Sequence, residues 1–310
     1  MGAVRTPIQW IAREGDGQTV REVLLRAGAD ALAVAEGRVF VGRRRVRREE
    51  ERVRTGDVLQ VAPPRPDERP PALRVLARTD DLVAVDKPAG ISTIADHTGA
   101  EHALASIVAR TLGVQASSVH PTSRLDRDVS GVVVFALTRR AAARLARART
   151  RGEYARRYVA VAARTPSPER GIWDAPIGTA SDPKLRLVRG RNAVPAQTRY
   201  ALCAQATHGE AMLAVCPVTG RTHQIRVHAA HARAPLIGDR AYGGPVRVVL
   251  SSGIVLQPKR IALHAMRVEV PADRSEKLVA VSPVPEELLR LWAALGGDTA
   301  SWQLSASCGL

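Results

Sequence analysis

This 310-residue chain has few aromatic residues, few lysines and few cysteines. The aromatic residues are 4 Trp, 4 Tyr and 2 Phe, which is too few for a broad sheet surface on which several bases stack. The cysteines are odd in number and far apart, at Cys203, Cys216 and Cys308, which argues against a disulfide framework and a thiolate metal site. The longest strongly apolar run, residues 132–137, is far shorter than the ~20 residues of a membrane span. We therefore expect a reduced, soluble, cytoplasmic protein without a membrane partner.

Acidic residues are also in deficit. The chain has 30 Asp and Glu against 46 Lys and Arg, which gives a formal net charge of +16. Only four of the 46 basic residues are lysines, so the excess is carried by arginine. Guanidinium groups suit bidentate contacts with phosphates, and the charge therefore indicates a polyanionic partner. A basic protein with solvated charged faces would have the same composition, and this alternative stays open at the level of charge alone.

A proline-rich stretch divides the chain. Five prolines lie within residues 63–71, and because proline disfavours helices and central strands, residues 63–72 are predicted to form a linker. Residues 1–15 are expected to be an N-terminal segment, and residues 16–62 a small domain. With 45% hydrophobic and 25% charged residues, the chain has a globular composition and is long enough for a second, larger domain.

The small domain has the pattern of two helices followed by a hairpin sheet. We predict a helix capped by Thr19 and stopped by Gly28, a helix at 30–36, two strands at 38–46 around Gly42, and a strand at 55–61. This order resembles the small alpha-L RNA-binding domain first seen in a ribosomal protein. However, three glutamates follow its arginine cluster directly, and residues 16–62 contain 10 basic and 8 acidic residues. A solvated hairpin is therefore the alternative to an RNA-binding surface.

The larger domain is predicted to span residues 73–295, followed by a loose C-terminal tail at 296–310. Strand-like apolar runs are mixed with helical patterns, which indicates an α+β fold. The predicted strands include residues 82–85, 132–137, 158–163 and 211–215.

Most of the excess charge lies in one part of this domain. Residues 103–165 contain 12 basic and 3 acidic residues, a net charge of +9 out of +16. Within this region, Arg140, Arg144, Arg147 and Arg151 have the spacing of one side of a helix. A solvated helix face is the ordinary explanation for such a stripe, and contact with RNA phosphates is the functional one.

Two polar segments carry the residues best suited to chemistry. Asp126 lies in Arg-Leu-Asp-Arg-Asp-Val-Ser-Gly at 124–131, directly before an apolar strand, where a carboxylate can be both exposed and held in place. The second segment, Thr-Gly-Arg-Thr-His-Gln-Ile-Arg-Val-His at 219–228, is unusually rich in polar donors. Taken singly, Asp126 could be a turn residue and Arg226 a surface charge.

Together these segments resemble the RluA-type family of RNA pseudouridine synthases. Three further matches occur in the family's order: Asp-Lys-Pro-Ala-Gly-Ile-Ser-Thr at 86–93, Ile-Gly-Asp-x-x-Tyr-Gly at 237–243 and Leu-His-Ala at 263–265. The related RsuA-type enzymes typically have Gly-Arg-x-Arg-Gln-Val-Arg-Arg where this chain has Gly-Arg-Thr-His-Gln-Ile-Arg. The segment at 219–228 therefore favours the RluA type.

The resemblance implies isomerisation of uridine in RNA. The N1 glycosidic bond is broken, the uracil turns, and C5 is joined to the ribose C1′, without a metal or other cofactor. It assigns catalytic roles to Asp126, Tyr158 and Arg226. Asp126 attacks C1′ or removes the C2′ proton, and the sequence does not choose between these. Arg226 pairs with Asp126 and favours its ionised form, while Tyr158 stacks on the flipped uracil and is a candidate for assisting proton removal at C5.

The remaining candidate residues bind substrate. They are Arg124, Arg127, Arg221, Thr222, His223, Gln224 and Leu263 around the two segments, with Arg140, Arg144 and Arg147 on the predicted helix. Periodicity at 219–228 fits either a strand or a helix capped by Thr222, and the family favours the helix. The family fold implies a mixed, largely antiparallel curved sheet flanked by helices.

Two departures from the family pattern are present. Ser123 stands where a histidine commonly precedes Arg-Leu-Asp, and Arg156 stands where lysine is usual. The first motivates an alternative function, an RNA-binding or ribosome-assembly factor whose catalytic centre has lapsed. A DNA-binding regulator, a metal site at the histidines of 223–231 and a glycosidase pair of Asp126 with Asp128 are less well supported. We expect a monomer that acts on ribosomal or transfer RNA.

Overall fold

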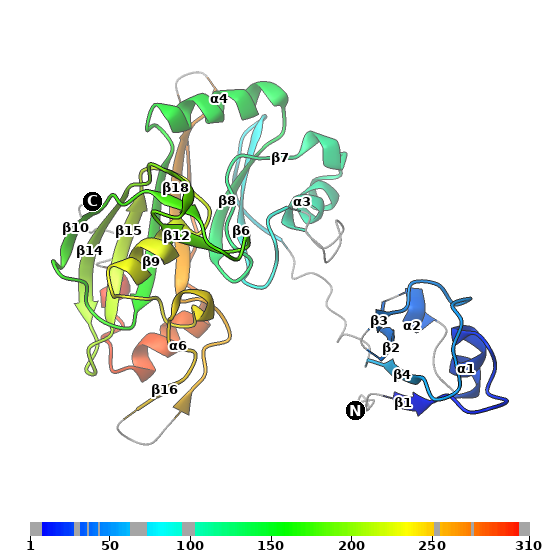
Figure 1. Cartoon of the computed structure of the whole chain (residues 1–310). Coiled ribbons are helices and arrows are strands. Elements are labelled where there is room, and N and C mark those ends of the chain that lie inside the picture. Colours follow the sequence, from blue (N-terminus) through cyan, green and yellow to red (C-terminus); the bar gives the residue numbers. More distant parts are fainter. Residues whose placement is uncertain are drawn as a thin grey trace. The chain divides into compact units, whose positions relative to one another are not determined.

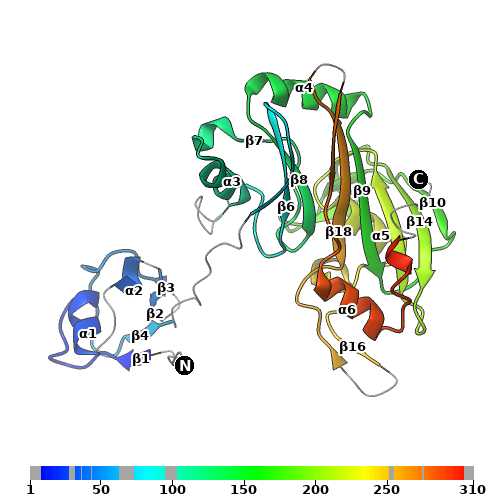
Figure 2. The same ribbon diagram turned by 180° about the vertical axis from the view of Figure 1, so that it is seen from behind.

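The chain folds into two compact units, residues Met1–Pro71 and Ala72–Leu310. Its structure is a computed structural model that describes residues 8–27, 32–35, 37–42, 44–62, 73–94, 103–250, 255–273 and 276–303. Both units are drawn in Figure 1 and, from behind, in Figure 2. The predicted linker at 63–72 lies outside the described residues, and each unit is considered by itself.

The N-terminal unit holds a four-stranded antiparallel sheet in the order β1-β4-β2-β3, together with two helices. Their bounds are β1 (Ile8–Ile11), α1 (Val20–Arg26), α2 (Leu32–Ala35), β2 (Val39–Val41), β3 (Arg44–Arg45) and β4 (Val58–Val61). Thr19 caps α1 in a capping box with Glu22, as predicted. The helix ends at Ala27, and the expected stop at Gly28 lies outside the described residues.

One strand of this unit was not expected. The sequence pattern starts the domain at residue 16, whereas β1 lies before that residue and pairs with β4 along its whole length. An edge strand of four residues offers too short a pattern to be detected by alternation. Val20, Val23 and Leu59 are among the residues of one buried cluster made entirely within this unit.

The larger unit is built on a ten-stranded sheet, whose main path runs in the order β10-β14-β15-β9-β18-β8-β6-β5. β19 pairs with β18, and β7 pairs with β8. The strands are β5 (Arg74–Arg78), β6 (Leu82–Lys87), β7 (His120–Pro121), β8 (Ser130–Ala136), β9 (Ala155–Ala162), β10 (Arg170–Trp173), β14 (Thr198–Gln205), β15 (Ala211–Pro217), β18 (Leu263–Pro271) and β19 (Lys277–Val281).

Only the central β8–β18 pair of this sheet is parallel among the described strands, and the other pairs are antiparallel. The predictions of a mixed, largely antiparallel sheet and of strands in the four apolar runs are confirmed. At this parallel pair Gly131 has φ +115°, and a Cβ there would lie 2.2 Å from the carbonyl oxygen of Ala265. Glycine is therefore required where the two strands approach.

Helices cover both faces of the sheet because its central strands are apolar on both sides. On β8, Val133 and Phe135 contribute to one buried cluster, while Val132 and Val134 contribute to another. The first cluster lies under α3 and α5; α4 covers the second, and α6 covers a third cluster with β9 and β15. These helices are α3 (Leu104–Leu112), α4 (Arg139–Thr150), α5 (Gln224–His231) and α6 (Glu286–Ala294).

Short elements complete the unit. They are η1 (Ala116–Ser118), β11 (Ile177–Thr179), β12 (Arg186–Val188), β13 (Arg191–Val194), η2 (Arg240–Tyr242), β16 (Val248–Val249) and β17 (Val255–Leu256). The expectation of a loose tail after residue 295 is wrong up to residue 303. Trp302 is buried and its ring meets that of Trp292 on α6, and residues 304–310 lie outside the described residues. None of the described helices is long and apolar enough to cross a bilayer.

Candidate active site

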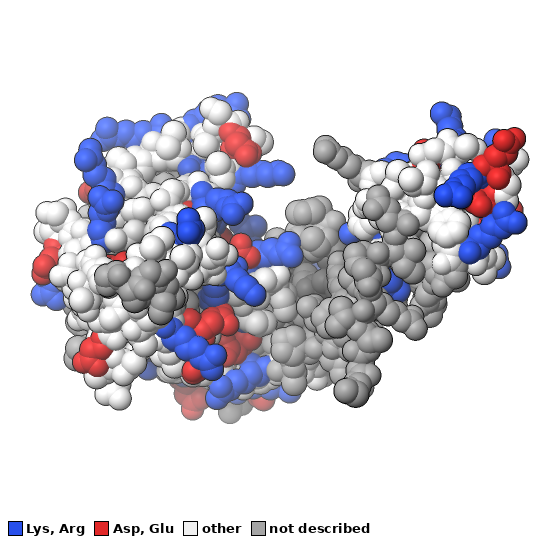
Figure 3. Space-filling view, turned by 90° about the horizontal axis from the view of Figure 1, so that it is seen from below, with Lys and Arg blue, Asp and Glu red and all other residues white. Residues whose placement is uncertain are grey.

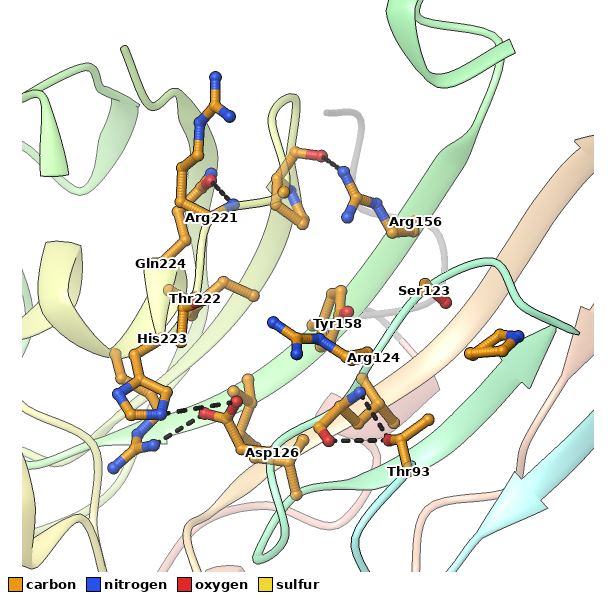
Figure 4. Close-up of a pocket in the computed structure, with 18 of the residues that line it drawn as sticks. Thr93, Ser123, Arg124, Asp126, Arg156, Tyr158, Arg221, Thr222, His223 and Gln224 are labelled. Carbon is orange, nitrogen blue, oxygen red and sulfur yellow. Dashed lines mark hydrogen bonds and ion pairs between the residues drawn. The ribbon is translucent and has the colours of Figure 1, made fainter. Parts of the chain in front are cut away.

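A pocket of about 630 Å³ opens on the face of the sheet that carries α3 and α5. Its walls are the loop between β7 and β8, the loop between β15 and α5, the residues following β6, and side chains from β9 and β18. Ten of the predicted site residues line it: Asp126, Tyr158, Arg226, Arg124, Arg127, Arg221, Thr222, His223, Gln224 and Leu263. Figure 4 shows seven of them by label, with His223 next to Asp126.

The three predicted arginines of α4 do not line the pocket. Arg140 and Arg147 are exposed on the helix surface. Arg144 forms an ion pair with Asp81 at 2.9 Å, so its charge is offset within the protein. The helix itself is as predicted, but its stripe is not part of the site.

The backbone around Asp126 is fixed by the segment at 86–93. The Thr93 hydroxyl donates to the carbonyl of Leu125 at 2.9 Å and accepts from its N–H at 3.1 Å. On the other side of Asp126, the carbonyl of Arg127 accepts from the N–H of Gly90 at 2.8 Å and from the Nζ of Lys87 at 3.0 Å. The residues before and after Asp126 are therefore both anchored, which leaves the carboxylate partly exposed on a rigid support.

Lys87 organises this anchor from the end of β6. Its side chain is fully buried, and its Nζ also donates to the carbonyls of Pro88 at 2.9 Å and Ile91 at 2.7 Å. Burial lowers the pKa of Lys87 to about 7. Three carbonyl acceptors match the three protons of the ammonium form, which offsets part of the cost of burying it.

Asp126 accepts a hydrogen bond from Arg226, with 2.7 Å between Oδ2 and Nη1. The other edge of the guanidinium donates to both carboxylate oxygens of Asp239, at 2.8 Å each. Burial disfavours the charged form of Arg226, but the bonds to Asp239 and the charge of Asp126 outweigh it and raise the pKa of Arg226. The buried Asp239 therefore fixes the guanidinium, and Arg226 in turn presents one N–H to Asp126.

Tyr242 closes this arrangement from η2. The guanidinium of Arg226 lies 4.8 Å from its ring centroid, and its hydroxyl is 2.6 Å from Nδ1 of His223. Burial lowers the pKa of His223 and so favours the neutral imidazole, although the charge of Asp126 opposes this shift. The Nε2 of His223 lies 3.9 Å from Oδ1 of Asp126, and Figure 4 marks this contact with a dashed line.

The segment at 219–228 contains a helix, as the family pattern favoured, but its predicted cap is wrong. α5 starts at Gln224, and its N-cap is His223 rather than Thr222. His223 adopts a left-handed conformation with φ +56°, which is uncommon for a residue with a side chain. The contacts of its ring with Tyr242 accompany this conformation.

Tyr158 and Leu263 form the apolar floor of the pocket. Both are buried, on the neighbouring strands β9 and β18. Burial raises the pKa of Tyr158 to about 12, so the phenol stays protonated at neutral pH. An aromatic face in this position can stack on a base.

The other predicted residues differ in what their side chains do. Arg124 is exposed and extends into the cavity in Figure 4. Arg221 points away from Asp126 there, and its Nε donates to the carbonyl of Pro195 at 2.9 Å. The buried amide of Gln224 bonds Thr219, Arg221, Gln197 and Thr198, so it shapes the loop. Arg127 is likewise anchored, through Nε, to the carbonyl of Gly90 at 3.0 Å.

Several residues of the site were not singled out from the sequence. Asp239, Tyr242, Lys87 and Thr93 all lie in the matched segments at 237–243 and 86–93, so a signal was present although it did not assign them a role. Arg149 also lines the pocket. One arginine among many on α4 gave no such signal.

The comparisons with known proteins agree with this geometry. The model of the RNA pseudouridylate synthase family matches residues 81–231. The ribosomal large subunit pseudouridine synthase D of Xanthomonas campestris is 35% identical over 242 residues, which cover 74% of this chain and 71% of that protein. The dual-specificity RNA pseudouridine synthase RluA of Escherichia coli K12 is 32% identical over 213 residues, 66% of this chain and 94% of the relative.

Solved structures share the fold. Human RNA pseudouridylate synthase domain containing 4 aligns with a TM-score of 0.56 at 23% identity, covering 72% of this chain and 92% of that one. Human RNA pseudouridylate synthase domain containing 1 aligns with a TM-score of 0.55 at 24% identity, covering 69% of this chain and 84% of that one. Residues 81–231 include both Asp126 and Arg226. This chain belongs to the RluA family of RNA pseudouridine synthases, which are RNA uridine isomerases.

Proposed function

We propose that this enzyme isomerises specific uridines in ribosomal or transfer RNA, with the target base flipped out of the RNA into the pocket beside Asp126. The observation that carries the proposal is the carboxylate of Asp126, which is partly exposed and held at 2.7 Å by a guanidinium that is itself fixed on Asp239. A carboxylate in this setting is held where the ribose of a flipped uridine would bind. It can attack C1′ or take the C2′ proton, and either route requires the charged form.

The other side chains have complementary roles in this proposal. Tyr158 receives the uracil on its ring, because this ring lines the pocket and an aromatic face can stack on a base. Arg124 is exposed at the cavity and is available to the displaced RNA strand or its phosphates. Leu263 completes the apolar wall against the base. These roles need only the side chains of this chain and the RNA.

The walls of the pocket suit RNA electrostatically. Among the described residues, six arginines and a single acidic residue, Asp126, line it: Arg124, Arg127, Arg149, Arg156, Arg221 and Arg226. Figure 3 also shows basic side chains spread over the face in view, with acidic ones in smaller clusters. A positive surface strengthens association with RNA by releasing counterions. We further propose that the N-terminal unit, which has the helix and hairpin order of an alpha-L domain, binds RNA beside the target.

Replacing one carboxylate oxygen of Asp126 by an amide nitrogen tests the catalytic role of this residue. Asp126→Asn keeps the size of the side chain but removes the charge, and we expect pseudouridine formation to fall by at least about 10³-fold with no change in melting temperature beyond a few degrees. Asp128→Asn is the matched control, since Asp128 is exposed in the same loop and does not line the pocket. It should retain activity.

The substrate is total RNA from cells that lack this protein, because such RNA contains the unmodified target. Pseudouridine is mapped before and after incubation with the wild-type chain and both variants. One site that the wild type and Asp128→Asn modify and Asp126→Asn does not would support the proposal. Full activity of Asp126→Asn would contradict it, and the absence of any new site with wild type would favour a lapsed RNA-binding factor.

A further inference from the structure

The end of the pocket near α4 holds two arginines that the proposed chemistry does not use. Arg149, on α4, and Arg156, on β9, lie against the ring of Tyr154, with guanidinium carbons 4.9 Å and 5.7 Å from its centroid. Both arginines line the pocket, together with Ser123 and Gly220. In Figure 4, Arg156 and Ser123 are drawn on the same side of the cavity.

These two charges lack an acidic partner. Among the described residues, no carboxylate lies within ion-pair distance of either guanidinium, whereas Arg144 on the same helix pairs with Asp81. The Nε of each of the two arginines is buried without a hydrogen-bond partner in the described part of the chain. Burial, together with the charge of Arg156, lowers the pKa of Arg149. Two nearby, partly buried like charges repel each other and are costly to bury, and an anion bound between them would offset that cost.

Both guanidiniums are held in place by backbone oxygens. Arg149 donates to the carbonyl of Thr122, in the loop that carries Asp126. Arg156 donates to the carbonyls of Pro217 at 3.0 Å and Thr219 at 2.8 Å, at the start of the loop that leads to α5. Each arginine thus keeps an Nη1 group that makes no bond to these carbonyls. The pair is therefore positioned before any ligand arrives.

A hydroxyl completes this cluster. The hydroxyl of Tyr154 lies 3.2 Å from Oγ of Ser123 and 2.9 Å from Oγ1 of Thr122. When Thr122 donates to Tyr154 and Tyr154 donates to Ser123, the proton of Ser123 is available to a ligand in the pocket. Ser123 occupies the position at which the family commonly has histidine. A serine hydroxyl and two guanidiniums are all donors, and a tetrahedral oxyanion accepts several such bonds at once.

We propose that Arg149, Arg156 and Ser123 bind one phosphate of the RNA backbone, the phosphate adjacent to the uridine that enters the pocket. This inference rests on the proposed function, because Asp126 at the ribose and Tyr158 at the base place the target nucleotide in the same cavity. The sugar of a bound nucleotide lies one bond from its flanking phosphates. The subsite would thereby set the register of the RNA strand over Asp126.

Binding of a short RNA tests the subsite without turnover. The probe is a nine-nucleotide single-stranded RNA with one central uridine among adenosines, titrated against the full chain at several KCl concentrations. Arg149→Gln and Arg156→Gln should each lower the slope of log K against log salt by about 0.7. The double variant should lose about the same amount, because both arginines bind a single phosphate. Arg290→Gln, an exposed arginine on α6 paired with Glu286, is the control and should leave the slope unchanged.

A second arm identifies the phosphate. Replacing one phosphate at a time by an uncharged methylphosphonate should weaken binding to the wild type about tenfold at one position next to the uridine. The same replacement should have no effect on the double variant. If Arg149→Gln does not fold, Arg156→Gln carries the salt test. Ser123→Ala, which removes a hydrogen-bond donor but no charge, should weaken binding without changing the slope. Inorganic phosphate at the same concentration as the RNA should not displace the RNA. Displacement would mean that the cluster is a site for free phosphate and not for a phosphate of the RNA backbone.

The outcomes separate this inference from the proposed function. An unchanged slope in the double variant, or a loss of about 1.4, overturns the shared phosphate. An equal methylphosphonate effect in wild type and double variant also overturns it. If the binding results are as expected but no RNA gains pseudouridine, the proposed function fails and the subsite stands.

Discussion

The orientation of Arg226 in the pocket depends on Asp239, a residue that does not line the pocket. Its two-point contact with Asp239 uses the Nε and one terminal nitrogen, so the remaining nitrogen has one direction left, toward Asp126. Asp239 is 1% exposed and cannot contact substrate. It is a positioning residue whose effect on the reaction passes through Arg226.

Replacement of Asp239 by asparagine tests this role. Asp239→Asn retains one acceptor oxygen but removes the charge, so Arg226 is no longer held in the orientation that presents one N–H to Asp126. We expect kcat to fall at least about tenfold with KM changed less, and the free energy of unfolding to drop by about 3 kcal/mol, because a buried ion pair loses one partner. Steady-state kinetics and urea denaturation measure the two effects.

Asp81→Asn provides the comparison for Asp239→Asn. It breaks an Asp–Arg pair of similar length, 2.9 Å, away from the pocket and nearer the surface. Its cost should be about 1 kcal/mol or less, without loss of activity. An equal loss of kcat in both variants would mean that Asp239 acts through general stability and does not position Arg226.

At the scale of elements, the segment after β6 acts as a clamp on the loop between β7 and β8. Lys87→Met keeps the length of the side chain but removes three hydrogen bonds to buried carbonyls, one of them at Arg127. We expect a loss of about 3 kcal/mol in the free energy of unfolding, and a lower kcat because the backbone beside Asp126 is no longer fixed. Lys277→Met, at an exposed lysine of β19, should change both by little.

The clamp requires that Lys87→Met lowers both the free energy of unfolding and kcat. If Lys87→Met lowers stability while pseudouridine forms at the wild-type rate below the unfolding transition, then Thr93 and Gly90 alone fix the loop. Thr93 bonds Leu125, on the other side of Asp126, and would be sufficient in that case.

Elements with local signals were predictable, and elements fixed by distant contacts were not. β8 is a continuous apolar run buried on both faces, and the capping box of α1 lies within four residues. By contrast, the left-handed His223 that starts α5 is in contact with Tyr242, nineteen residues away. The same holds for the site: motifs identified Asp126 and Arg226, but the pairing with Asp239 needed the fold.

At the scale of the whole molecule, hydrophobic burial divides cleanly between the two units. One core cluster draws only on residues of the N-terminal unit, and the other four draw only on the larger unit. Because each unit buries its own apolar residues, either should fold without the other. We therefore expect the N-terminal unit to contribute to RNA binding as a tethered second contact, as proposed above, and not to the stability of the catalytic core.

Removal of residues 1–71 tests that view. We expect the shortened chain to unfold cooperatively at nearly the same urea concentration, to keep its kcat, and to bind structured RNA at least about tenfold more weakly, because a tethered second contact raises effective concentration. The salt dependence of binding should also fall, since basic residues of the small unit no longer displace counterions. Adding the separate N-terminal unit at equal concentration should not restore affinity, because it lacks the tether. If instead affinity is the same with and without residues 1–71 at every salt concentration, the hairpin of this unit is a solvated surface and the catalytic unit alone selects the RNA.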